Sequence, residues 1–143
     1  MRVIGLDLGS KTCGVALSDQ SGLIASGIKT LHFEEEDYEE ALRLVKDLYS
    51  QLQAEKIVVG WPKHLNGDVG QRGWIAQRFA ELLQEELGTE VELWDERLTT
   101  VAAERLLISA DVSRKKRKAV IDKLAAVYIL QAYLDAERQK KND

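Results

Sequence analysis

The spacing of hydrophobic residues changes once along this 143-residue chain, and the change limits the folds that the chain can adopt. Before residue 32, apolar residues form strand-like segments at 2–8, 13–18 and 23–31, separated by turns rich in Gly, Ser and Asp. From Tyr38 to Leu52 they recur every three or four positions, which is typical of an amphipathic helix. The pattern predicts an antiparallel three-strand meander followed by a helix that covers one face of the sheet.

Strands and helices alternate after this helix. Apolar segments predict strands at 56–60 and 90–95, and the loop at 61–73 holds the only proline. The expected helices are 75–87, ended by Gly88; one from about Val101, capped by Thr99 or Thr100; and 118–137. Because strands joined through a helix become parallel, the order predicts one α/β domain over residues 1–143 with a mixed five-stranded sheet flanked by helices.

Composition excludes some classes of protein. A formal net charge of −4 argues against a protein that coats nucleic acid through overall positive charge, although a local basic patch can still hold a phosphate backbone. No apolar run approaches the roughly 20 residues of a membrane-spanning helix. The sequence begins directly with a strand pattern and no signal peptide, and Cys13 has no disulfide partner. We therefore expect a cytoplasmic protein with Cys13 buried as a small hydrophobic residue.

Asp7 is the most informative residue, because it interrupts the apolar strand pattern of residues 3–9. Burying a carboxylate is unfavourable unless a basic group, a hydrogen-bonded turn or a cation compensates it. One interpretation is that Asp7 binds the backbone of the turn at 9–12. The other is that Asp7 is a metal ligand.

Glu96 and Asp122 are two further carboxylates at positions where function is plausible. Glu96 follows the expected strand at 90–95, at the edge of the sheet where ligand sites gather, and Asp95 should point to the opposite face. Asp122 precedes the small residues Ala125 and Ala126, which would let its helix approach the sheet closely. The alternatives are a surface ion-pair cluster for residues 95–97 and a dipole-complementing surface position for Asp122.

Four ordered motifs together resemble one family, the bacterial Holliday-junction-resolvase-like proteins also known as pre-16S ribosomal RNA nucleases. These are 4–9 (IGLDLG), 60–63 (GWPK) with Asn66-Gly67, 95–100 (DERLTT) and 121–126 (IDKLAA). The resemblance covers essentially the whole chain. It implies an RNase H-like fold, a cytoplasmic nuclease that matures the 5′ end of small-subunit ribosomal RNA, and active-site acids at Asp7, Glu96 and Asp122. Trp61 and His64-Leu65 are less typical of the family.

The chemistry of phosphodiester hydrolysis explains why three acids would be needed. Two metal ions can neutralise the phosphate, activate a water and stabilise the leaving oxygen. Carboxylates without a Cys and His cluster suit Mg²⁺ or Mn²⁺ and argue against zinc. Asp7 is the best candidate to bridge both ions, because a central strand would hold it rigidly.

Basic residues supply the expected contacts to nucleic acid. The leading patch is Arg114, Lys115, Lys116, Arg117 and Lys118, just before the helix that carries Asp122. Cations at a helix N-terminus oppose the helix dipole, and an anionic ligand would offset that cost. A solvated charge run is the alternative. Lys11 and Arg97 are second candidates for phosphate contacts, whereas His32 and His64 are expected to be ordinary surface or loop residues.

Two other functions compete with the nuclease. Residues 7–12 also resemble the phosphate loop of actin-like ATPases and sugar kinases, but such enzymes need two lobes and this chain supplies one. A non-catalytic nucleic-acid-binding module of the same fold would gain nothing from a repulsive cluster of carboxylates. The sequence does not decide whether the substrate is RNA or branched DNA, so a Holliday-junction-type DNA resolvase remains the alternative activity. It also leaves open whether cleavage is endonucleolytic or exonucleolytic, and whether the protein is a monomer or a homodimer. The role of the loop at 61–73 is open as well.

Overall fold

The computed structural model describes residues 1–64, 66–98 and 114–142, with the backbone alone for residues 114–123 and 142. Five strands form one mixed sheet: β1 (Val3–Leu8), β2 (Thr12–Ser18), β3 (Ala25–His32), β4 (Lys56–Trp61) and β5 (Glu90–Asp95). Their order in the sheet is β3-β2-β1-β4-β5. β1 pairs antiparallel with β2 and parallel with β4, and β5 extends the parallel half. The antiparallel meander and the two parallel strands agree with the sequence prediction.

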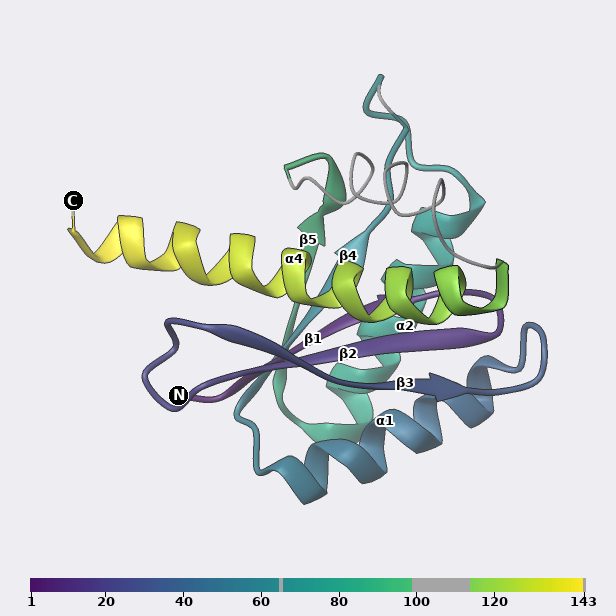
Figure 1. Cartoon of the computed structure of the whole chain (residues 1–143), viewed down its shortest axis with the longest axis horizontal. Helices are drawn as coiled ribbons and strands as arrows, with labels where there is room; N and C mark the ends of the chain where they lie inside the picture. Colours follow the sequence, from purple (N-terminus) through teal and green to yellow (C-terminus); the bar gives the residue numbers. More distant parts are fainter. Residues whose placement is uncertain (65, 99–113, 143) are drawn as a thin grey trace.

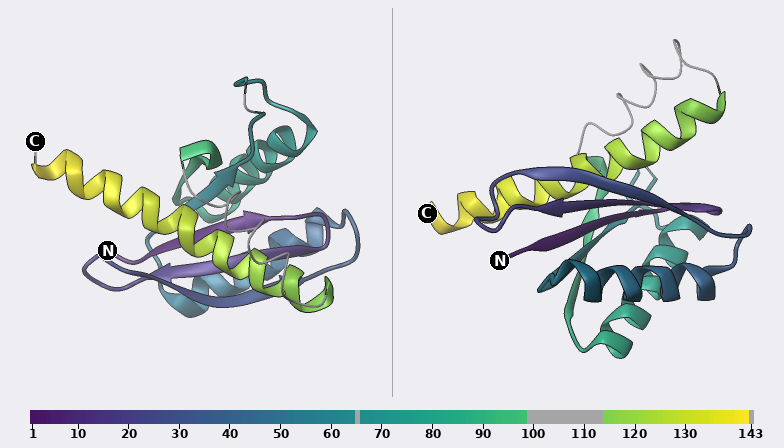
Figure 2. Two further views of the ribbon diagram at one scale, coloured as in Figure 1. Left: turned by 45° about the horizontal axis from the view of Figure 1, so that its top comes forward. Right: turned by 60° about the horizontal axis from the view of Figure 1, so that its bottom comes forward.

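Helices cover both faces of the sheet. α1 (Tyr38–Leu52) and α2 (Gln71–Leu87) pack on one face, and the long helix α4 (Arg114–Asn142) crosses the other face (Figure 1). Figure 2 shows in its right-hand view that the sheet lies between these two layers. A short 3-10 helix, η1 (Glu96–Leu98), follows β5. No helix in the described ranges is long and apolar enough to cross a membrane.

The core has one part on each face. β1 shows why: Ile4, Leu6 and Leu8 point toward α1 and α2, whereas Val3 points toward α4. Burying each such side chain stabilises the fold by about 1.5–3 kcal/mol. Cys13 is fully buried on the α1 and α2 side, which confirms its interpretation as a small hydrophobic residue.

Local signals in the sequence account for two helix ends. The Asp37 side chain accepts a hydrogen bond from the Glu40 backbone N–H and caps the start of α1. Gly88 ends α2 in the left-handed conformation, with φ of 64°, and its N–H donates to the Gln84 carbonyl, as predicted.

α4 differs from the prediction in its limits and in its buried face. It begins at Arg114, not near Lys118, so the basic run lies inside the helix and not before it. Lys and Arg are good helix formers, and no Gly or Pro interrupts the run. The apolar spacing predicted a buried face made of Ile121, Leu124, Ala125, Tyr128 and Ala132. The residues of α4 that are buried against the sheet include Ala125, Ala126, Ile129 and Leu130, whereas Leu124, Tyr128 and Ala132 are half-buried and the Ile121 side chain is outside the described part. The helix expected from about Val101, with its cap at Thr99 or Thr100, falls outside the described residues.

The other elements lie close to their predicted limits. β5 has the predicted bounds, β4 extends one residue further to Trp61, and β3 runs from Ala25 to His32. α2 begins at Gln71, inside the loop predicted at 61–73. The first turn of the helix therefore takes the place of the last residues of that loop.

α4 packs closely on the sheet at Gly5 in β1. A Cβ atom added at Gly5 would lie 2.7 Å from the Leu130 Cβ and 3.2 Å from the Ala126 carbonyl oxygen. Glycine is therefore required here to let the helix backbone pack on the strand. This contact fixes the height of α4 above the carboxyl ends of β1 and β4.

Candidate active site

Asp7 is buried on the sheet face that α4 covers. Side chains alternate along a strand, and Gly5 faces α4, so Asp7, two residues later, faces α4 as well. Asp7 is 8% exposed, so its carboxylate lies at the margin of the core. The sequence predicted this burial from the apolar residues on either side.

Glu96 reaches the same face from the end of β5. A Cβ added at Gly60 would lie 2.7 Å from the Glu96 Oε1 and 2.5 Å from the Ile129 Cδ1 of α4. The Glu96 carboxylate therefore packs directly on the backbone of β4 beside α4. The absence of a side chain at Gly60 creates the space that the carboxylate occupies.

The strand register brings Asp7 and Glu96 to one region. β1 and β4 are parallel neighbours with Leu6 paired to Val59, so Asp7 and Gly60 are the next residues along the two strands. Glu96 covers Gly60, so both carboxylates lie at the carboxyl edge of the sheet on the α4 face. Two acids that are 89 positions apart in the sequence thus meet because adjacent parallel strands end together.

Asp122 lies in the backbone of α4, one helical turn before Ala126. α4 begins at the end of the sheet where β1 finishes, so this turn lies on the Asp7 side of the Gly5 contact (Figure 1). The Asp122 side chain lies outside the described part of the structure. Among the side chains that are described, no three His, Cys, Asp or Glu residues form a group that could hold a metal ion.

Asp95 forms an ion pair with Arg97. Its carboxylate accepts hydrogen bonds from the Arg97 backbone N–H at 3.0 Å and from the Arg97 Nη2 at 2.7 Å. The Arg97 guanidinium, aided by the charge of Lys63, holds the pKa of the Asp95 carboxyl below its ordinary value. The ion pair that the sequence offered as an alternative for residues 95–97 thus exists between Asp95 and Arg97.

Three residues near the site were not singled out as site residues by sequence reasoning. Gly60 makes room for Glu96, and the Lys63 ammonium lies 4.1 Å from the centre of the Trp61 ring. Both stand in the motif at 60–63, which was the available signal. Arg72 in α2 donates from Nη2 to the Leu8 carbonyl at 2.8 Å and ties α2 to the end of β1 next to Asp7. No sequence pattern pointed to Arg72.

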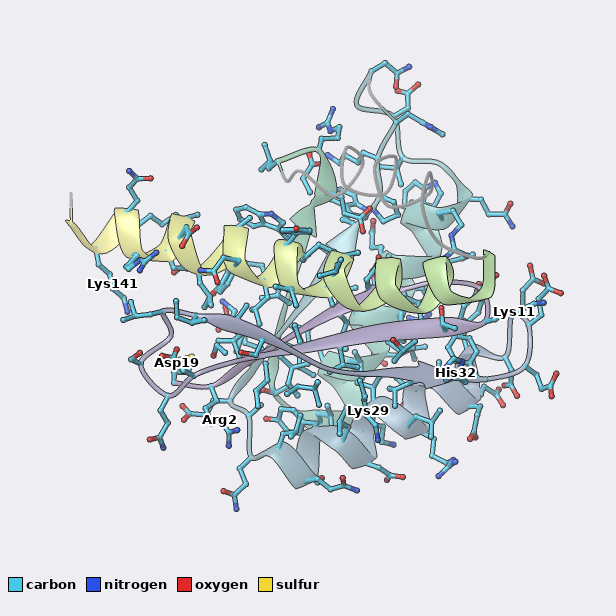
Figure 3. All side chains as sticks on the ribbon, viewed as in Figure 1. Arg2, Lys11, Asp19, Lys29, His32 and Lys141 are labelled. Carbon is cyan, nitrogen blue, oxygen red and sulfur yellow. The ribbon has the colours of Figure 1, made fainter. Side chains whose placement is uncertain are left out.

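Of the other basic residues predicted to contact nucleic acid, the structure describes only some side chains. Lys11 is exposed in the turn after β1, at the opposite end of the sheet from Asp19 and Lys141 (Figure 3). This turn is closed by a 2.7 Å hydrogen bond from the Gly9 N–H to the Thr12 carbonyl. The side chains of Arg114, Lys115, Lys116, Arg117 and Lys118 lie outside the described residues.

Comparison with protein families gives a match over most of the chain. The family model RuvX, described as Holliday junction resolvase, matches residues 1–136. The chain belongs to the RuvX family. A relative from Geobacillus sp. (strain WCH70) is 56% identical over 138 residues, covering 96% of this chain and 100% of the relative. One from Bacillus cytotoxicus is 58% identical over 137 residues, covering 96% and 100%. Both relatives carry the name "Putative pre-16S rRNA nuclease".

Solved structures support the fold of this RuvX family member. Thermus thermophilus RuvC in complex with a Holliday junction substrate superposes with a TM-score of 0.67 at 13% identity, covering 97% of this chain and 96% of RuvC. The fowlpox virus Holliday junction resolvase gives 0.55 at 16% identity, covering 95% and 99%. At these identities the likeness establishes the fold alone, and it confirms the predicted RNase H-like architecture.

Proposed function

We propose that residues 1–143 act as one divalent-metal-dependent nuclease domain whose catalytic carboxylates are Asp7, Glu96 and Asp122. Two findings support phosphodiester hydrolysis: the chain belongs to a family described as Holliday junction resolvase, and its relatives are named as nucleases. The observation that carries the choice of residues is the Glu96 carboxylate packed on Gly60, beside the strand that buries Asp7. Asp122, whose side chain is not described, is included because its helix turn lies on the same side of the sheet.

The donor set fits Mg²⁺ or Mn²⁺. Carboxylate oxygens are the ligands that these hard ions take, and Cys13 packs on the opposite face of the sheet. A bound ion of this class supplies positive charge at the phosphate and acidifies water. Asp7, Glu96 and Asp122 would hold the ion, with Asp7 fixed by β1, Glu96 by the turn after β5 and Asp122 by α4.

Basic groups of the chain would hold the substrate strand. Arg114, Lys115, Lys116, Arg117 and Lys118 occupy the first turns of α4, where no acidic residue offsets the helix dipole. Phosphates bound there would balance the positive charge of these side chains and of the helix N-terminus. Lys11 and Arg97 stay in the proposal as second contacts.

The proposed substrate is the 5′ region of pre-16S ribosomal RNA, met in the cytoplasm. Relatives at 56–58% identity over nearly the whole chain carry this substrate in their name, which favours RNA over DNA. Cleavage of a four-way DNA junction is the second candidate, because the family description names the Holliday junction.

A cleavage assay distinguishes these candidates. Purified protein is incubated with pre-16S RNA that carries its 5′ extension and with a four-way DNA junction, each with Mg²⁺, Mn²⁺ or chelator. We expect metal-dependent cleavage of the RNA and none with chelator or in Asp7→Asn. Binding of both substrates without cleavage under any metal would instead favour a non-catalytic module.

A further inference from the structure

We propose that Lys63 and Arg97 form a phosphate-binding pair on the outer side of Glu96, and that this pair holds the backbone of the nucleic-acid strand. The inference rests on the proposed nuclease function and adds a specific subsite to it. Lys63 has no role in the site as described so far, and Arg97 gains a defined geometry.

The strand register brings the two cations to the same edge. β4 and β5 are parallel neighbours, and Trp61 is paired with Asp95 at their carboxyl ends. Lys63 follows Trp61 by two residues and Arg97 follows Asp95 by two residues, so the two segments leave the sheet side by side. Glu96 lies between Asp95 and Arg97 in the chain and turns back onto Gly60.

The Asp95 carboxylate orients Arg97 and leaves part of its guanidinium available. Asp95 accepts from Nε at 3.1 Å and from Nη2 at 2.7 Å, so it occupies one edge of the planar group. Nη1 lies on the other side, where a Cβ added at Gly67 would be 3.5 Å away. That separation is an ordinary van der Waals contact, and the Arg97 side chain is 32% exposed, so a phosphate oxygen can reach the guanidinium from solvent. An arginine held on one side by a carboxylate is preorganised for such a contact.

Lys63 is held by a different interaction. Its ammonium lies 4.1 Å from the centre of the Trp61 ring, which restricts the side chain without neutralising its charge. The positive charge of Lys63 also lowers the pKa of the Asp95 carboxyl, which the Arg97 guanidinium lowers more strongly, so both cations lie near this carboxylate. A phosphate between them would bring a second anion to this pair, in line with the strong charge-assisted hydrogen bonds that phosphates form with Arg and Lys.

The pair is tested by nucleic-acid binding in chelator, where no cleavage takes place. A fluorescein-labelled single-stranded RNA is titrated with wild type, Lys63→Met and Arg97→Gln over a series of salt concentrations. Each variant should bind several-fold more weakly, and the slope of log affinity against log salt should fall by about 0.7 for each lost phosphate contact. Lys63→Arg should restore most of the slope.

Lys46→Met is the matched control, because Lys46 lies on α1 and pairs with Glu86 at 2.6 Å on the other face of the sheet. It should leave both affinity and slope unchanged. Thermal melts establish that each variant is folded, and Arg97→Met, which also removes the charge, serves if Arg97→Gln is unstable. Wild-type slopes in Lys63→Met and in a folded Arg97 variant would overturn the pair while leaving the nuclease proposal standing. A wild-type protein that neither binds nor cleaves nucleic acid would overturn both.

Discussion

The Glu96 carboxylate rests on the backbone of Gly60, with Oε1 only 2.7 Å from the point where a Cβ of residue 60 would lie. The same point is 2.5 Å from the Ile129 Cδ1 of α4. Gly60 therefore sets the position of a proposed catalytic acid and of the helix that carries another. Substitutions at positions 60 and 129 can test the effect on Glu96 and the effect on α4 separately.

Replacing Gly60 with Ala should abolish metal-dependent cleavage and lower stability by about 1–3 kcal/mol, since the added methyl group must displace Glu96 and Ile129. Denaturant unfolding and the cleavage assay measure the two effects. Ile129→Val removes the Cδ1 atom from the clash, so the Gly60→Ala/Ile129→Val double variant should regain part of the stability. It should stay inactive, because Glu96 is still displaced. Recovery of activity in the double variant would show that Glu96 does not depend on Gly60.

Asp7→Asn should reduce cleavage to the background rate while the melting temperature stays the same or rises. The amide keeps the size of the carboxylate and removes a negative charge from a position that is 8% exposed. RNA binding in chelator should be unchanged. Full activity in this variant would eliminate Asp7 as an essential metal ligand.

Mg²⁺ or Mn²⁺ should raise the melting temperature of the wild-type protein, because an ion that binds only the folded state stabilises it by mass action. The gain is about 2.7 kcal/mol at a hundred times the dissociation constant. Glu96→Gln and Asp122→Asn should each reduce this shift, whereas Asp95→Asn should reduce it less, because Asp95 is bound to Arg97. Equal metal-induced shifts in wild type, Glu96→Gln and Asp122→Asn would mean that the acids do not form one site.

Replacing Arg114, Lys115, Lys116 and Arg117 together with Ala should weaken RNA binding and flatten its salt dependence, because these cations lie in the first turns of α4. Metal affinity should change little. The variant should also be at least as stable as wild type, since cations at a helix start are unfavourable and Ala is a strong helix former. A salt slope equal to that of the wild type would mean that these basic residues are a solvated charge run and do not bind phosphate.

Asp19→Asn should lower the melting temperature at neutral pH and have little effect near pH 2. Hydrogen bonds from the Ser21 hydroxyl and from the Ile24 and Leu23 backbone N–H groups lower the Asp19 pKa from 3.8 to about 2. Because the folded pKa is the lower one, the stabilisation is present above the unfolded value and is lost as pH falls through the folded value. Melts of both proteins from pH 2 to pH 7 measure the difference, which should shrink toward acid. A constant difference would mean that the Asp19 charge contributes nothing to stability.

The sequence alone determined the elements, their order and the residues that stand out chemically. Hydrophobic spacing and turn residues decide local structure, so the bounds of β5 and the Gly88 cap of α2 could be predicted closely. The buried position of Asp7 also followed from its apolar neighbours. These features depend on residues close together in the chain, whose interactions a pattern can represent.

Only the tertiary structure decided which atoms meet. α4 is apolar on more than one side, so its packed face depends on the close approach of Gly5 to Ala126 and Leu130 and not on helical spacing. The contact between Gly60 and Glu96 and the hydrogen bond from Arg72 to the Leu8 carbonyl join residues that are 36 and 64 positions apart. Such contacts depend on strand register and on the height of a helix above the sheet, which are set by the packing of the whole core and not by any one segment.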